Sequence, residues 1–383
     1  MEKFSSYRDA GTGIQPFLTP LPPAGSEILV QATLPIRYAL AAVRTALLLV
    51  LLLAYVLIVR VALLIFLPIS PVYDLLVHLN TAILGRSALF ILGLVWIPVD
   101  YITKKRKSAL KTEVPWNPKA GDIIVSNWVS WIELIWLAIR FNPIFVLPVP
   151  ASEASTAQKL PTPSSNASPI AYTPGRRTGT GSANIQQAAR SASARIPVAG
   201  FRQVSLLQMI TSTGRVPYIA GPSDQLKTIE DIRKKARQPI VVFPESTTSN
   251  GRGLLRFANV FNMSVPVKGF DVFVMCVRYD PPTAFVPSLA HSIPSRFLNP
   301  LLHLTSLTAA PSLLSISIRL LALSDSPSSQ LFMANEYVSG TPGEDQLTES
   351  CATLISQIGK LKQTGMGWED KASLLQLYWG KKR

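Results

Sequence analysis

The stretch Val241–Phe257, which reads VVFPESTTSNGRGLLRF, decides the class of fold that we expect. The apolar run from Ile240 to Phe243 is rich in β-branched residues, so it predicts a short buried strand that stops at Pro244. An acid, hydroxyl residues and a guanidinium follow: Glu245, Ser246, Thr247, Thr248, Ser249 and Arg252. Open α/β sheets bind ligands at the carboxyl ends of their strands, and these groups suit a substrate that carries hydroxyls and a phosphate.

This stretch resembles the third signature block of the glycerolipid acyltransferase family, commonly Phe-Pro-Glu-Gly-Thr followed by a basic, glycine-containing loop. Ser246 stands here in place of the usual glycine. The resemblance implies that Glu245, Ser246 and Thr247 position the glycerol backbone of a lipid. It implies that Arg252 neutralises a phosphate.

A second match is Ser126–Glu133, which reads SNWVSWIE. The corresponding family block usually begins Asn-His and continues toward Ser-Trp-x-Asp; its histidine takes a proton and its aspartate orients the histidine. Here Trp128 occupies the histidine position and Glu133 the aspartate position. Because an indole nitrogen only donates, Trp128 cannot replace the base. Ser130 either caps the following helix or donates to an oxyanion.

Three outcomes stay open at this block. Glu133 acts as the base, directly or through water, with a pKa raised by burial. Alternatively, a histidine from elsewhere, such as His291, reaches the site. In the third outcome the chain binds lipid without transferring an acyl group. For phosphate binding, the family places an arginine after a strand where this chain reads Ala220, Gly221 and Pro222. Arg215 either substitutes for that arginine or is an ordinary surface residue.

Composition indicates a membrane protein. Of 383 residues, 48% are hydrophobic and only 15% are charged, whereas soluble domains carry about 25% charged residues. The net charge of +15 favours anionic lipids, nucleic acid or a coenzyme A thioester, and the chain has no nucleic-acid-binding motif. Its two cysteines, Cys276 and Cys351, suggest neither a disulfide framework nor a metal site.

The amino-terminal part divides into a leader and a membrane segment. We expect residues 1–35 to be a flexible or extended leader and residues 36–103 to be membrane-associated. Ala39–Leu67 is the strongest apolar run, and Ala88–Val99 is short for a span. The segment is either a helical hairpin with both ends cytosolic, or one span with an interfacial helix. A basic cluster at 104–107 and 111 marks the cytosolic side.

The remainder predicts an interrupted α/β domain over residues 104–150 and 196–323. Residues 151–195 are rich in Ser, Ala, Thr and Pro and predict a disordered insertion. We expect helices over Phe201–Ser212 and Ile229–Lys235, a strand edge over Gly214–Ile219, and strands within 121–126, 265–279 and 313–323. Residues 324–383 are expected to form a carboxyl-terminal helical region, with an amphipathic helix over 344–361.

The expected fold is therefore α/β: an acyltransferase-like mixed sheet flanked by helices, with an amino-terminal hydrophobic hairpin. The resemblance implies transfer of a fatty acyl group from acyl-CoA to the free hydroxyl of a lysophospholipid, with no metal or bound cofactor. It implies membrane lipids as partners and a cytosol-facing place on the endoplasmic reticulum or on lipid droplets. The alternative is a lipid-binding or trafficking protein on the same fold. The oligomeric state stays open.

Overall fold

The computed structural model of the chain describes residues 4–23, 31–103, 116–151, 193–221, 225–330, 332–333 and 345–380. The basic cluster expected at 104–107 and 111 lies outside the described residues. So does all of the expected insertion except its two ends.

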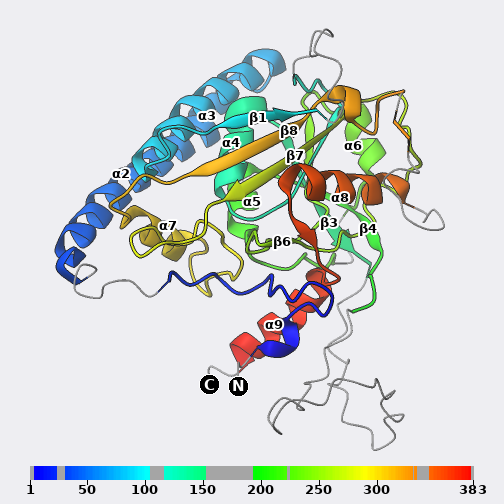
Figure 1. Cartoon of the computed structure of the whole chain (residues 1–383). Helices are drawn as coiled ribbons and strands as arrows, with labels where there is room; N and C mark the ends of the chain where they lie inside the picture. Colours follow the sequence, from blue (N-terminus) through cyan, green and yellow to red (C-terminus); the bar gives the residue numbers. More distant parts are fainter. Residues whose placement is uncertain are drawn as a thin grey trace, which may run out of the picture.

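The centre of the molecule is a seven-stranded mixed sheet in the order β1-β8-β7-β2-β5-β3-β4 (Figure 1). Its strands are β1 Val99–Ile102, β2 Ile123–Ser126, β3 Ile144–Pro150, β4 Val198–Val204, β5 Ile240–Val242, β7 Val272–Tyr279 and β8 Ile316–Leu321. Strands β7, β2, β5 and β3 are parallel to one another, while β8 and β4 join them antiparallel. A separate small ladder pairs β6 Gly253–Leu254 with β9 Lys362–Gln363. This confirms the predicted mixed α/β class.

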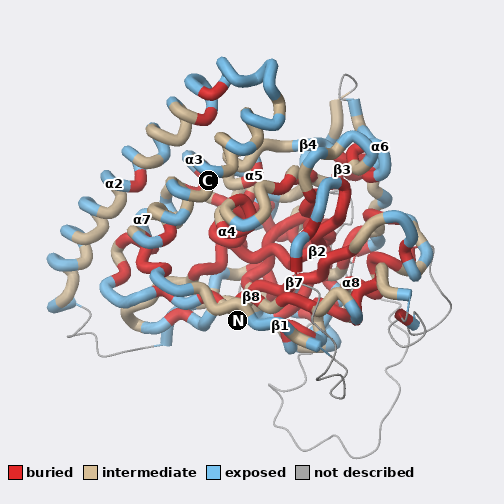
Figure 2. The backbone as a smooth tube through the Cα atoms, turned by 90° about the horizontal axis from the view of Figure 1, so that it is seen from above, coloured by how far each residue is buried: buried red, intermediate tan, exposed pale blue. Residues whose placement is uncertain are grey.

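Helices cover both faces of this sheet. They are α4 Ile132–Phe141, α5 Leu206–Ser212, α6 Ile229–Lys235, α7 Leu301–Thr308 and α8 Gln346–Gly359. The last helix, α9 Trp368–Gly380, packs with residues of the amino-terminal leader. Short 3-10 turns occupy Ser5–Tyr7, Ala62–Phe66 and Leu323–Asp325. Because side chains alternate along a strand, Ile124 packs in the core beneath α4, whereas Ile123 and Val125 pack in the core beneath α6 and α8. Figure 2 shows the buried residues concentrated in the sheet and its adjoining loops.

Two local predictions next to the sheet are wrong. The predicted helix over Phe201–Ser212 begins only at Leu206, because Ser205 and Gln208 form a capping box there. The residues before it extend β4 along β3 as an antiparallel partner. The predicted strand edge over Gly214–Ile219 is irregular chain, which leaves its side chains at the site described below.

Two amino-terminal helices, α2 Leu34–Arg60 and α3 Ser70–Leu92, are long and apolar enough to cross a membrane. Helix α3 begins at Ser70, well before the apolar run Ala88–Val99, which by itself is short for a span. The length predicted for this second helix is therefore wrong. Polar residues such as Asp74 and His78 interrupt the apolar sequence of its first half, so the apolar run alone does not predict where the helix begins. The run itself spans the end of α3, where Gly93 adopts a left-handed cap, and reaches β1.

The hairpin is attached to the α/β part at two places. Helix α3 lies against α4 at Gly85, where a Cβ atom would come within 3.0 Å of the Ile139 side chain. Helix α2 lies against the end of α7, where the Arg44 guanidinium donates to the Ala310 carbonyl at 2.7 Å and Thr45 shares a hydrogen bond with Thr308 at 2.9 Å. The outward residues of both helices stay exposed (Figure 2).

Residues 4–23, in the leader predicted to be flexible or extended, are packed against the rest of the protein. Tyr7 and Phe17 are buried with Leu255 and with Leu374 of α9. The Asp9 carboxylate accepts a hydrogen bond from the backbone N–H of residue 365 at 2.8 Å. Burial of two aromatic side chains stabilises this docking. The leader and α9 therefore form one outer layer next to the loop after β5 (Figure 1).

Candidate functional site

The two stretches singled out in the sequence, Ser126–Glu133 and Val241–Phe257, meet at the carboxyl ends of β2 and β5. The Trp128 N–H donates to Glu245 Oε1 at 2.9 Å, and the Ser249 N–H donates to the Trp128 carbonyl at 3.0 Å. Strands β2 and β5 are parallel neighbours, so their following loops emerge at the same edge of the sheet.

Glu245 holds these loops together from inside. Its second carboxylate oxygen, Oε2, accepts from the Leu255 N–H at 3.2 Å, and the side chain is fully buried. Burial raises the pKa of Glu245 to about 8, against the opposing effect of the two backbone donors. Both oxygens therefore accept hydrogen bonds from backbone amides. Glu245 thus fixes the conformation of the two loops.

Glu133, at the start of α4, has a similar environment. Its Oε1 accepts from the N–H groups of Val129 at 2.6 Å and Ser130 at 2.7 Å, and its Oε2 accepts from the Tyr279 hydroxyl. Burial raises its pKa to about 7, which these hydrogen bonds only partly offset. The carboxylate therefore fixes the turn between β2 and α4, and the Ser130 side chain is buried in that turn.

Trp128 packs inside this corner. Its ring lies 5.2 Å from the Phe243 ring, and its indole N–H donates to the Ser130 carbonyl at 3.2 Å. The indole donor is therefore used within the loop. The side chain also contributes to the wall of a neighbouring pocket.

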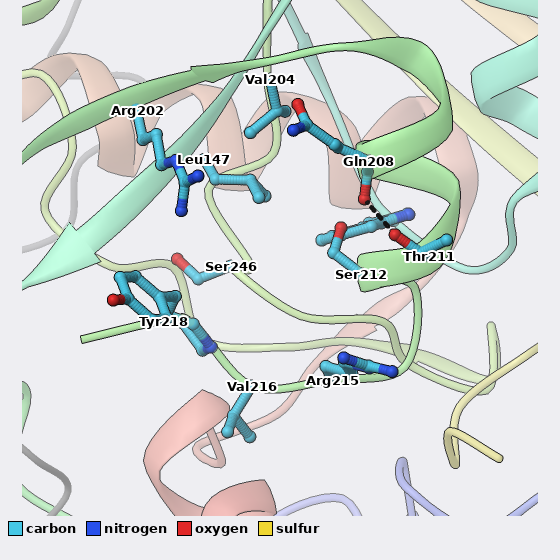
Figure 3. A pocket seen from close by; sticks show the side chains of 12 residues that line it. Leu147, Arg202, Val204, Gln208, Thr211, Ser212, Arg215, Val216, Tyr218 and Ser246 are labelled. Carbon is cyan, nitrogen blue, oxygen red and sulfur yellow. Dashed lines mark hydrogen bonds between the residues drawn. The ribbon is translucent and has the colours of Figure 1, made fainter. Parts of the chain in front are cut away.

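This pocket has a volume of about 280 Å³ and is bounded by β4, α5 and the irregular chain that follows α5. It carries two cations, Arg202 from β4 and Arg215 from the chain after α5, which lie on either side of Ser246 in the view of Figure 3. Among the described residues neither arginine pairs with a carboxylate. The Arg202 guanidinium lies 5.6 Å from the centre of the Tyr218 ring. Such an arrangement can accept an anion.

Ser246 forms the floor of this pocket in a left-handed conformation, with φ of 58°. That region favours glycine, so the Ser246 side chain sits on a strained backbone. Thr247, next to it, donates to the Arg215 carbonyl at 2.7 Å. The loop after β5 and the chain that carries Arg215 are thus directly connected.

Lys371 of α9 enters the same loop from behind. It is fully buried, and its Nζ donates to Thr247 Oγ1 at 2.8 Å and to the Thr248 carbonyl at 2.7 Å. Burial lowers the pKa of Lys371 well below its usual range. The carboxyl-terminal helix therefore supports the loop that forms the pocket floor.

The predicted residues fall into two groups. Arg215 and Ser246 line the pocket, whereas Glu133, Ser130, Glu245 and Thr247 lie buried behind its wall. Arg252 is exposed and does not line the pocket, so the predicted phosphate contact has no support from its position.

His291 also stays behind the pocket wall. Its ring stacks on His303 at 4.7 Å between centroids, and its Nε2 shares a hydrogen bond with Asn299 Oδ1 at 2.7 Å. Burial lowers its pKa to about 4. Its backbone nevertheless touches the block that contains Trp128, because its N–H donates to the Val129 carbonyl at 2.9 Å.

Sequence reasoning missed Arg202 and Lys371. Each is a lone basic residue, one in a segment predicted as helix and one near the chain end, and neither belongs to a motif. Comparison of the chain with known protein families, with curated proteins and with solved structures found no match.

Proposed function

We propose that this protein transfers a fatty acyl group from acyl-CoA to the free hydroxyl of a lysophospholipid, such as lysophosphatidic acid, at a membrane surface. The observation that carries the proposal is the pair of arginines, Arg202 and Arg215, in a pocket floored by Ser246 of the Phe-Pro-Glu-Ser-Thr loop. A pair of solvent-accessible cations of this kind, beside hydroxyl groups at the carboxyl ends of parallel strands, suits a phosphorylated glycerol.

In the proposed reaction the lysophospholipid phosphate lies between the two arginines, and its glycerol lies against Ser246 and Trp128. The free hydroxyl oxygen attacks the thioester carbonyl; a C–O bond forms, the C–S bond breaks, and the hydroxyl proton ends on the sulfur of coenzyme A. Fixed orientation of two reactants can itself lower the barrier by about 7–11 kcal/mol. The occupied oxygens of Glu133 support an orienting role for it; its action as a base stays a prediction.

The apolar helices α2 and α3 support a membrane location for this reaction. Lysophospholipids and acyl-CoA both partition to membrane surfaces, because their acyl chains are apolar. A protein held there meets both substrates at a raised local concentration. We propose a cytosol-facing position on the endoplasmic reticulum or on lipid droplets.

A second candidate is lipid binding or trafficking without acyl transfer. One observation favours it: the described residues that line the pocket include neither a carboxylate nor an imidazole. General-base catalysis typically contributes about 10²–10⁴-fold to a rate, and no side chain of the pocket wall supplies it. The same two arginines would then hold a lipid phosphate for delivery.

The test uses the full-length protein in proteoliposomes, with labelled oleoyl-CoA and lysophosphatidic acid. Wild type is compared with Arg202→Gln, Arg215→Gln and, as the matched control, Arg252→Gln. A hydrogen bond to a charged group is worth about 1.5–3 kcal/mol. Each pocket variant should therefore lose about ten- to a hundred-fold in kcat/KM, while the control should lose less than about two-fold.

A parallel measurement of lysophosphatidic acid binding separates the two candidates. Binding by wild type that weakens in both pocket variants, with labelled product absent, establishes the trafficking candidate and ends the proposed transfer. Equal product from wild type and both pocket variants would show that the pocket is not the phosphate site.

A further inference from the structure

Large apolar side chains project into solvent from the segment 296–302, which we name the apolar lip. Phe297 and Leu298 are each 74% exposed, and Leu302 at the start of α7 is 65% exposed. Arg296 lies beside them and is exposed as well. Exposed large apolar groups that cluster with a cation are typical of surfaces that contact lipid or another protein.

The buried Asn299 side chain holds the lip in a fixed conformation, so the exposure of the lip does not result from disorder of the segment. The Asn299 Nδ2 donates to the carbonyls of Thr211 at 3.0 Å and Thr213 at 2.7 Å. Its Oδ1 accepts from the Ser295 N–H at 3.0 Å and shares a hydrogen bond with His291 Nε2 at 2.7 Å. All four contacts fix the base of the lip while Phe297 and Leu298 point away from the core.

The same contacts attach the lip to the pocket. Thr211 is part of the pocket wall, and Arg215 follows directly after the turn at Gly214. A Cβ atom at Gly214 would come within 2.9 Å of the backbone of Pro294, so the two chains touch there. The lip is therefore the outer side of the wall that carries one of the two pocket arginines.

The other end of the lip leads to the apolar hairpin. Helix α7 follows it, and the end of α7 binds α2 through Arg44 and Thr45. Both views show α7 beside α2 (Figures 1 and 2). A membrane that receives the outward residues of α2 would thus continue toward the lip and the pocket.

We propose that the apolar lip inserts into the leaflet that holds the hairpin, and so places the pocket at the headgroup level of a phospholipid membrane. A phospholipid leaflet suits this surface because its apolar tip is flanked by Arg296 and backed by Arg215, and cations close to an apolar tip are attracted by anionic headgroups. A lipid can then enter the pocket without crossing bulk water.

The experiment places a fluorescent probe on the lip of the full-length protein in phospholipid vesicles. Phe297→Cys is labelled with an environment-sensitive dye; the two native cysteines are buried and do not compete. The matched control is Glu230→Cys, whose side chain is exposed on α6; α6 packs in the core on the opposite face of the sheet from the core that contains α7. Leu302→Cys is a second lip site for the case in which Phe297→Cys fails to fold.

Brominated lipids should quench the lip probe by about two-fold or more and leave the control unchanged, because bromines sit at the acyl-chain boundary. A lip probe no more quenched than the control would overturn the proposal. A lip probe that is shielded from water, unquenched by bromine and sensitive to protein concentration would assign the lip to a second protein molecule instead. Neither readout needs acyl transfer, so this inference and the proposed function can fail separately.

Discussion

Replacing Glu245 by glutamine tests whether this buried carboxylate shapes the site. Glutamine keeps the volume but turns one acceptor into an N–H donor, so either the Trp128 or the Leu255 amide loses its partner. Leaving a buried donor unpaired costs about 1–3 kcal/mol. Solvent cannot replace the lost partner, because the side chain is fully buried.

The pH dependence of the unfolding free energy distinguishes this effect from a simple packing defect, which would not change with pH. The folded pKa of Glu245, about 8, lies well above the usual range of a glutamate. Its stabilising contribution is therefore complete below the unfolded pKa and is lost as pH rises through the folded pKa, by up to about 1.4 kcal/mol per pH unit. Glutamine does not titrate. The variant should thus be about 1–3 kcal/mol less stable than wild type near pH 5. Its deficit should vanish or reverse toward pH 8, because the pH-dependent loss of wild-type stability over this range is the larger effect.

The assay is equilibrium unfolding in urea of the full-length protein in detergent micelles, followed by tryptophan fluorescence, near pH 5 and near pH 8. Glu230→Gln is the control, because Glu230 is exposed on α6 and lies 4.0 Å from Lys234. That change should stay within about 0.5 kcal/mol at both pH values. A Glu245→Gln variant as stable as wild type near pH 5, or with a deficit that does not change with pH, would refute this reasoning.

Three further predictions concern the packing around the site. Ser246→Gly should be as stable as wild type or more stable by up to about 1 kcal/mol, whereas Ser246→Val should be destabilised by more than about 1 kcal/mol in the same urea assay, because φ at this position is 58°. Burial lowers the folded pKa of His291 to about 4, so wild type loses the stability contributed by the neutral imidazole as pH falls from about 6.5 toward 4. Because glutamine does not titrate, His291→Gln should gain stability relative to wild type over this range. Unfolding near pH 7 and pH 4.5 checks it. Gly359→Ala should lower the melting temperature through a loss of about 1–3 kcal/mol, because its Cβ would lie 2.5 Å from the Cys276 sulfur, while Gly380→Ala, which meets nothing within 4 Å, should not.

Much of the core of the fold was predictable from local pattern. The runs 123–125 and 272–277 are wholly apolar, as strands buried on both faces must be, and they lie in β2 and β7. Helix α6 was predictable as well, because Thr228 caps its first turn and basic residues fill its last. The loop after β5 was recognisable because Pro244 ends the strand and polar residues follow.

Other parts depend on partners that are distant in the sequence. Helix α3 contains polar residues, and its docking against α4 at Gly85 is visible only in three dimensions. The leader looked unstructured because its two buried aromatic residues, Tyr7 and Phe17, find their partners near the other end of the chain. Arg202 lies in a segment that also reads as helix, so its place in a pocket could not be inferred.

The amino-acid sequence by itself determined which groups gather at the carboxyl ends of β2 and β5, since apolar runs become buried strands wherever they lie and deliver their flanking residues to one edge. Only the tertiary structure decided which of those groups face a ligand. Glu133 and Glu245 use their oxygens on backbone amides, Lys371 arrives from α9, and Arg202 and Arg215 are left without carboxylate partners among the described residues. The physical reason is that hydrogen-bond partners are chosen by proximity in space, and contacts between distant segments leave no periodic signal in the chain.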